Sequence, residues 1–250
     1  MSDAALFEAR GVTKSFGGLA ALRELTFEIR SGEILGVIGP NGAGKTTLVN
    51  HISGLMVPEA GDLRFRGESL LGLGPHRISR LGVARTFQTA RPFTRLTVAE
   101  NVLIGALFGR SGPARSLEAA RARRDEMLRL VGLEALKSTR VLHLTMADRK
   151  RVELARALAM DPELLLLDEV MAGLNPTEVG EAMELVRAIN RGGMTILVVE
   201  HVMKAIMGLS SRIVVLHHGE KIADGSPEQV TRDPAVIQAY LGARYAVGRG

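Results

Sequence analysis

A glycine-rich segment at residues 39–47 contains the residue types that point most directly to a chemistry. A glycine, four further residues, a second glycine, a lysine and a threonine form the phosphate-binding loop pattern. Glycines let successive backbone N–H groups converge on an anion, and the start of a following helix adds partial positive charge. We therefore expect the loop to bind the phosphates of a nucleotide through Gly39, Pro40, Asn41, Gly42, Ala43, Gly44, Lys45, Thr46 and Thr47.

Polar residues that suit phosphate chemistry follow other apolar segments. Lys45 can reach the β- and γ-phosphates, while the Thr46 hydroxyl and the Asp168 carboxylate can hold Mg²⁺. Glu169, one residue further, is placed to orient an attacking water. His201 can contact the γ-phosphate, although a lone histidine is more often structural. From the residues alone, Asp168 and Glu169 can also be ordinary surface acids after a buried strand. The residues also do not decide whether the γ-phosphoryl group is transferred to water or to another acceptor.

The elements that position these residues are apolar strands alternating with helices. The runs 33–38, 163–167 and 195–199 are strand-sized, and each precedes one of the candidate residues. Alternation of this kind predicts a mostly parallel sheet covered on both faces. Ligands bind at the carboxyl ends of such strands, so we expect the candidates to converge on one edge.

The chain divides by the character of its segments. Residues 1–87 are rich in strand patterns, among them 6–10, 25–29 and 62–66. Residues 88–160 look helical and begin with a capping box at Thr97 and Glu100. We expect a single domain over 1–250, with a nucleotide-binding core at 1–87 and 161–246 and a helical subdomain at 88–160. Two short helices are predicted at the end, the second closed by Gly242.

Composition excludes several classes of function. The 250 residues contain no cysteine, which excludes disulfides and thiol chemistry, and no apolar run long enough to span a bilayer. The net charge is +5, but arginines between 110 and 129 alternate with acids and aromatics make up only 4%. That pattern is typical of a solvated helix face, so we expect no nucleic-acid partner. We expect a soluble, cytoplasmic protein.

The ordered set of motifs resembles the ATP-binding cassette (ABC) ATPases over nearly the whole chain. In that family the loop at 39–47 is Walker A, the run ending in Asp168 and Glu169 is Walker B with the catalytic glutamate, and His201 is the switch histidine. Gln88 matches the Q-loop, a further catalytic and metal-binding position, and Phe16 matches the aromatic that stacks on adenine. The segment 171–175 lies where the family has its D-loop.

The resemblance implies an α/β fold of the P-loop NTPase (RecA-like) type, with a mostly parallel sheet core, an antiparallel β edge and an inserted helical subdomain. It implies ATP and Mg²⁺ as cofactors. More narrowly, the segments 85–88, 172–176 and 239–242 resemble the ATP-binding subunits of branched-chain amino acid importers. The implied partners are transmembrane permease subunits, a second ABC ATPase subunit and, indirectly, a periplasmic or external solute-binding protein. The implied location is the cytoplasmic face of the inner membrane.

One motif departs from the family. Its signature, Leu-Ser-Gly-Gly-Gln, contacts ATP held by the other subunit, whereas this chain has Leu144, Thr145, Met146, Ala147 and Asp148. Ala147 adds a methyl group where backbone approaches phosphate, and Asp148 places a negative charge beside another. The same residues resemble a capping box for the next helix, so a working signature and a plain helix start are both open.

Two other function classes compete with a transporter ATPase. A soluble ABC protein of translation or DNA repair resembles paired cassettes or carries long coiled coils, and neither feature is present here. A small-molecule kinase needs an acceptor site and has no use for Glu169 or a signature segment. Phosphate release without an added acceptor would exclude the kinase.

Overall fold

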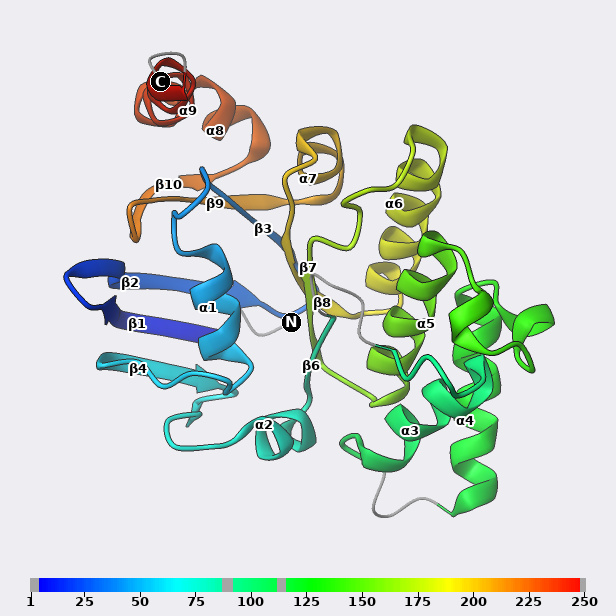
Figure 1. The fold of residues 1–250 in the computed structure, drawn as a ribbon. Coiled ribbons are helices and arrows are strands. Elements are labelled where there is room, and N and C mark those ends of the chain that lie inside the picture. The colour runs from blue at the N-terminus through cyan, green and yellow to red at the C-terminus, as the bar shows by residue number, and fades with distance from the viewer. Residues whose placement is uncertain (1–4, 87–91, 112–115, 248–250) are drawn as a thin grey trace.

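The computed structural model describes residues 5–86, 92–111 and 116–247, and its centre is a six-stranded sheet (Figure 1). The strand order is β10-β9-β3-β8-β7-β6, and neighbouring strands from β9 to β6 are parallel. The strands are β3 (Ile34–Ile38), β6 (Val83–Arg85), β7 (Leu164–Asp168), β8 (Thr195–Val199), β9 (Arg212–His217) and β10 (Glu220–Gly225). β10 pairs antiparallel with β9 at one edge.

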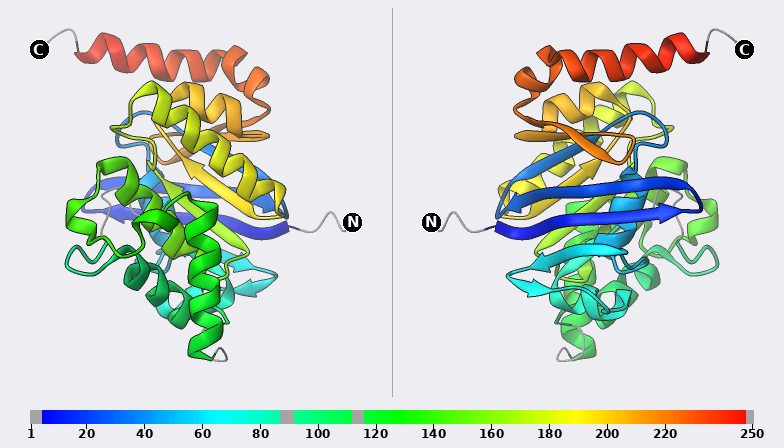
Figure 2. Two further views of the ribbon diagram at one scale, coloured as in Figure 1. Left: turned by 90° about the vertical axis from the view of Figure 1, so that its right-hand side faces the viewer. Right: turned by 90° about the vertical axis from the view of Figure 1, so that its left-hand side faces the viewer.

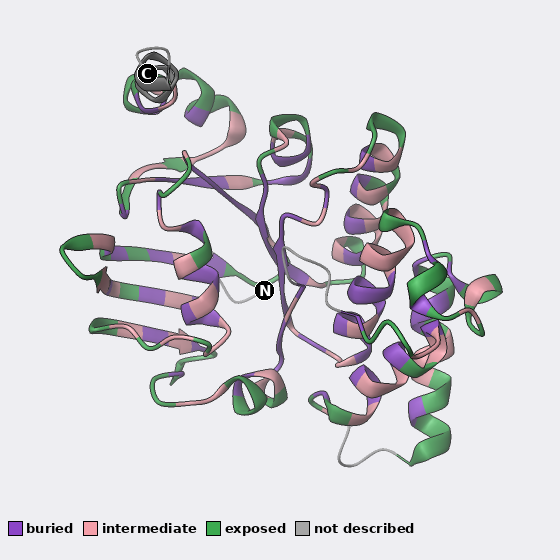
Figure 3. Ribbon diagram, viewed as in Figure 1, coloured by how far each residue is buried: buried purple, intermediate pink, exposed green. Residues whose placement is uncertain are grey.

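The parallel strands are buried on both faces, as their unbroken apolar sequences predict. Along β7, Leu164 and Leu166 pack into one core while Leu165 and Leu167 pack into the other. The two cores lie on opposite sides of the sheet because successive side chains of a strand point in opposite directions. Figure 3 shows this burial running through the middle of the molecule.

One face is covered by α1 (Lys45–Ile52) and by a second, antiparallel sheet in the order β2-β1-β4-β5. Its strands are β1 (Ala5–Phe16), β2 (Leu19–Arg30), β4 (Ala60–Phe65) and β5 (Glu68–Ser69). Phe7, Phe27 and Phe65 point into the core between this sheet and the parallel one. The antiparallel edge expected for the fold is therefore a separate sheet plus β10.

The other face is covered by helices that form the right-hand side of Figure 1. α3 (Val98–Phe108) begins at the capping box of Thr97 and Glu100, as predicted. α3 and α5 (Met146–Ala159) pack so closely that a Cβ atom on Gly105 would lie 2.2 Å from the carbonyl oxygen of Arg156. The remaining helices on the right are α4 (Leu117–Leu130), α6 (Pro176–Arg191) and two short 3₁₀ helices at Glu134–Leu136 and Val141–His143. α7 (Met203–Leu209), near the top of Figure 1, packs against the same core.

Several boundaries differ from the sequence expectations. β1 and β2 extend well beyond 6–10 and 25–29, because their pairing across the turn at Gly17 continues through polar residues. α2 (Pro75–Leu81), α7 and β10 were not anticipated. The final helix is not short, and Gly242 does not end it: α8 (Pro227–Arg232) is short, but α9 (Pro234–Val247) continues past Gly242 and lies across one end of the molecule (Figure 2). No helix within the described ranges is long and apolar enough to cross a membrane.

Candidate nucleotide-binding site

The phosphate-binding loop connects the carboxyl end of β3 to the start of α1. Gly39 has φ 157°, and a Cβ atom there would lie 2.2 Å from the carbonyl oxygen of Leu216. Gly44 has φ 103° immediately before the first residue of α1. Both positions need glycine because side chains are excluded or strained there. The loop is therefore wrapped tightly over the start of a helix, where backbone N–H groups favour an anion.

Lys45 is folded back onto this loop. Its Nζ donates hydrogen bonds to the carbonyl oxygens of Gly39 at 2.7 Å and Pro40 at 3.0 Å. Burial lowers the pKa of Lys45, and the carboxylates of Glu169 and Asp168 oppose that shift. The ammonium thus lies between the loop and two acids, where phosphate oxygens can replace the two carbonyl acceptors.

A cavity of about 460 Å³ opens beside the loop and brings together residues far apart in the sequence. Glu169, after β7, and His201, after β8, line it opposite the loop. Such convergence follows from the parallel sheet, whose strands all end at this edge. The lining is Leu19, Ala21, Asn41, Gly42, Ala43, Gly44, Lys45, Thr46, Thr47, Glu169 and His201.

Glu169 and His201 form a hydrogen-bonded pair inside the cavity. His201 Nε2 lies 2.8 Å from Glu169 Oε1. Glu169 has φ 52°, an uncommon conformation for a residue with a side chain, and its N–H donates to the carbonyl oxygen of Val199 at 2.8 Å. The carboxylate is thereby fixed near the loop, and a carboxylate so placed can orient a water molecule and accept its proton.

Asp168 ends β7 and is held by an arginine from the neighbouring strand. Arg85 Nη2 donates to Asp168 Oδ2 at 2.7 Å, and the same guanidinium donates to Asn50 Oδ1 and Ser53 Oγ on the α1 side. Burial raises the pKa of Asp168, while the hydrogen bond from Arg85 lowers it. Within the described residues Asp168 Oδ1 is buried and has no hydrogen-bond partner.

That oxygen, together with the hydroxyl of the exposed Thr46, which lines the cavity, fits a magnesium ion held partly by a nucleotide. No group of three or more acidic or histidine side chains in the described ranges could hold a metal unaided. Mg²⁺ commonly binds through one or two protein groups, substrate phosphates and water.

Several expected residues are not among those that line the cavity: Gly39, Pro40, Asp168, Phe16 and the segment 144–148. The Phe16 ring is half exposed and lies beneath the Lys14 ammonium, 5.6 Å from the ring centroid. Gln88 is outside the described residues. The segment 144–148 starts α5: Thr145 Oγ1 donates to Asp148 Oδ2 at 2.8 Å and accepts from the Asp148 N–H at 3.1 Å. The helix cap expected from the sequence is therefore present, and it occupies both side chains.

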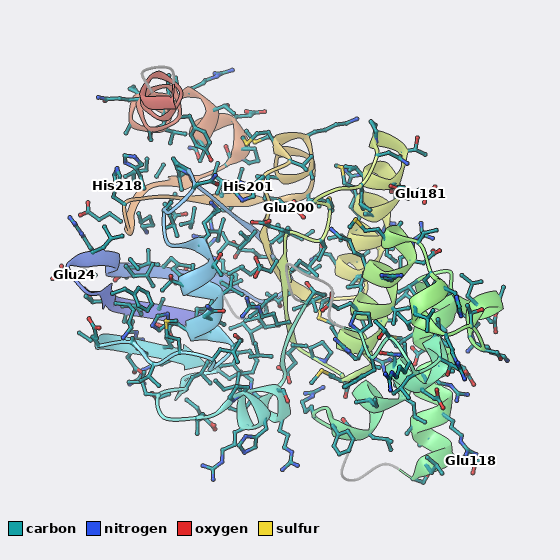
Figure 4. All side chains as sticks on the ribbon, viewed as in Figure 1. Glu24, Glu118, Glu181, Glu200, His201 and His218 are labelled. Atoms are coloured by element: carbon teal, nitrogen blue, oxygen red, sulfur yellow. The ribbon has the colours of Figure 1, made fainter. Side chains whose placement is uncertain are left out.

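Three further residues at this edge escaped the sequence reasoning as site residues. Arg85 ends a three-residue strand and is mostly buried. A buried arginine needs an acidic partner, so an arginine at the end of a strand was the signal in the sequence that could have indicated its pairing with Asp168. Glu200 directly follows the buried β8 and precedes His201 (Figure 4). Burial raises the pKa of Glu200 to about 7. Burial raises the pKa of Tyr240 in α9, and a hydrogen bond between Tyr240 and the backbone of Gly39 opposes that shift. This hydrogen bond means that α9 contacts the phosphate-binding loop.

The fold and the cavity define a nucleotide-binding P-loop protein. Comparison with known families identifies it further: the model of the ABC transporter family matches residues 22–172, and that of the branched-chain amino acid ATP-binding cassette transporter matches residues 220–246. The chain belongs to the ABC transporter family and is an ATPase of that family.

Curated relatives match over nearly their whole length. The high-affinity branched-chain amino acid transport ATP-binding protein LivG of Escherichia coli (strain K12) is 40% identical, covering 95% of this chain and 98% of the relative. BraF of Pseudomonas aeruginosa, of the same description, is 37% identical with the same coverage. The lipopolysaccharide export system ATP-binding protein LptB of Acidithiobacillus ferridurans is 33% identical, covering 97% of this chain and 99% of the relative.

Solved structures agree with the fold. The ADP conformation of MJ1267, an ATP-binding cassette of an ABC transporter, superposes with a TM-score of 0.86 at 28% identity. The match covers 96% of this chain and 99% of that one.

Proposed function

We propose that this chain is the ATP-hydrolysing subunit of an importer that takes up branched-chain or related amino acids through a separate permease. The observation that carries the proposal is the shared cavity of the phosphate-binding loop, Glu169 and His201. The match of residues 220–246 and the descriptions of LivG and BraF support the amino acid cargo. LptB, whose description names lipopolysaccharide export, shows that similar cassettes serve other cargoes.

In the proposed reaction Lys45 leaves the carbonyls of Gly39 and Pro40 and binds the β- and γ-phosphates, while loop N–H groups hold the rest of the phosphate chain. Glu169 orients the attacking water, and His201 fixes that carboxylate and faces the γ-phosphate. Thr46, Asp168 and Gln88 would hold Mg²⁺, which neutralises phosphate charge when bound. Phe16 would stack on the adenine.

Two kinds of protein partner are proposed. A second ATPase subunit would face the nucleotide cavity. The permease would place a cytoplasmic segment in a mainly apolar groove of about 410 Å³ between α2, β6, α3 and α5, whose lining includes Leu55, His76, Ile104, Phe108 and Met160. In this proposal the chain would be a peripheral subunit on the cytoplasmic face of the membrane. The competing function is a soluble ABC-type ATPase uncoupled from transport.

The main test uses Glu169→Gln in the purified complex with its permease. The amide keeps the shape of the side chain but cannot accept a proton, so ATP should still bind while hydrolysis and solute uptake fall about 100-fold or more. Hydrolysis at the parental rate would refute the proposed role of Glu169. Parental ATPase activity that no permease or solute-binding protein alters would favour the uncoupled ATPase.

We further propose that the segment 144–148 makes the assembly asymmetric. Thr145 and Asp148 are engaged with one another in the helix cap, and the Asp148 carboxylate would repel a phosphate of the second subunit. The nucleotide site that this segment completes should therefore turn over more slowly. The double variant Ala147→Gly, Asp148→Gln should raise hydrolysis by the complex, and an unchanged rate would count against the asymmetry.

A further inference from the structure

The turn that follows β7 is held by a lysine from α5. Lys150 Nζ donates to the carbonyl oxygen of Glu169 at 3.2 Å and to that of Ala172. Burial lowers the pKa of Lys150, and Glu200, Glu153 and Glu169 oppose that shift. The lysine thus joins the second turn of α5 to the backbone of the residue whose carboxylate lines the nucleotide cavity.

A carboxylate on the other side fixes the same turn. Glu200 Oε1 accepts a hydrogen bond from the Met171 N–H at 2.7 Å, and Glu200 is 2% exposed. Since Glu200 precedes His201, the turn is tied to the strand end that supplies the histidine partner of Glu169. Lys150 and Glu200 therefore hold residues 169–172 from two different elements.

The backbone of Glu169 needs such support. A non-glycine residue in the left-handed region is strained, and surrounding contacts must offset that strain. The N–H of Glu169 is bound by Val199, its carbonyl by Lys150, and its carboxylate by His201. Loss of the carbonyl contact would let the peptide rotate toward an ordinary conformation, and that rotation would turn the carboxylate away from the loop.

We propose that Lys150 is a positioning residue for Glu169 and that it links movement of α5 to the hydrolytic site of the same subunit. The segment 144–148 leads into the first turn of α5, so in the proposed dimer this end of α5 would meet the second subunit's nucleotide while the second turn holds this chain's own Glu169. The inference rests on the proposed function, in which those residues face a second ATPase subunit. Through this link, nucleotide bound at one site would change the rate of hydrolysis at the other site.

The test compares Lys150→Met and Lys150→Arg with Arg151→Met, measured as ATP hydrolysis by the purified complex. Arg151 is the next residue of α5 and pairs with the exposed Glu181, so it serves as a matched control. Lys150→Met should lower kcat about 10- to 100-fold with little change in KM, because about 1 Å of misplacement costs that much. Lys150→Arg should recover part of the rate, and Arg151→Met should match the parent.

A second measurement follows the backbone directly by amide hydrogen exchange in the complex. Residues 169–174 should exchange faster in Lys150→Met than in Arg151→Met. A non-hydrolysable ATP analogue should protect them in the parent and not in Lys150→Met. Should Lys150→Met fail to fold, Lys150→Gln carries the same expectations.

The outcomes separate this inference from the proposed function. A Lys150→Met complex with parental kcat and parental exchange, beside an inactive Glu169→Gln complex, would overturn the inference and leave the proposed function standing. Equal protection by the analogue in parent and variant would overturn the link through α5. An active Glu169→Gln complex would instead remove the proposed function on which the inference rests.

Discussion

Replacing Arg85 by methionine removes one partner of a buried ion pair. The Arg85 and Asp168 side chains are 8% and 1% exposed, and the pair distance is 2.7 Å. Without the guanidinium, Asp168 keeps a buried charge or takes up a proton. Protonating a carboxyl of ordinary pKa 3.8 at pH 7 costs about 4 kcal/mol. Removing one partner of a buried pair typically costs about 3–5 kcal/mol, so both routes give a similar loss of unfolding free energy.

The assay is urea unfolding of the full chain at pH 7, without nucleotide and with EDTA present. Arg85→Met should lower the unfolding free energy by about 3–5 kcal/mol with an unchanged m-value. Arg23→Met is the control, because the Arg23 and Glu220 side chains are 54% and 56% exposed and such a pair contributes up to about 1 kcal/mol. Adding Asp168→Asn to Arg85→Met should recover much of the loss, because no buried charge then remains unpaired. A loss below about 1 kcal/mol for Arg85→Met would refute the reasoning.

Two further predictions concern the same edge of the sheet. Folding raises the pKa of Glu200 from 4.5 to about 7, so between these pH values the folded chain keeps a proton that the unfolded chain releases. The contribution of Glu200 to the free energy of unfolding should therefore fall by up to about 3 kcal/mol as the pH rises through that interval. Glu200→Gln keeps an acceptor for the Met171 N–H but cannot titrate. Urea unfolding between pH 5 and 8 should therefore show a smaller fall in the free energy of unfolding for Glu200→Gln than for the parent. An equal fall in both proteins would contradict the raised pKa of Glu200 as its cause. The second prediction concerns the loop glycines: Gly39→Ala should weaken ATP binding and lower the free energy of unfolding by about 1–3 kcal/mol more than Gly42→Ala. The reason is that the methyl group added at Gly39 would clash with the Leu216 carbonyl oxygen, whereas the one added at Gly42 would meet open space. Equal effects of the two substitutions on urea unfolding and ATP titration would exclude that clash.

Local sequence patterns determined the main elements around the site. The phosphate-binding loop, the apolar strands before Asp168 and His201, and the helix caps at Thr97 and Thr145 were all predictable. Each depends on residues close together in the chain, where backbone conformation and side-chain spacing decide the outcome. The expectation that candidate residues meet at one edge followed from a general property of parallel sheets.

The tertiary structure alone decided which side chains support the proposed catalytic groups. Arg85 meets Asp168 across neighbouring strands, Lys150 reaches the Glu169 carbonyl from α5, and Glu200 binds the turn after β7. These contacts join residues between 19 and 83 positions apart, and no short spacing in the sequence encodes them. Their physical cause is burial: a charge withdrawn from water must find a partner, and the packing of strands and helices determines which partner is within reach.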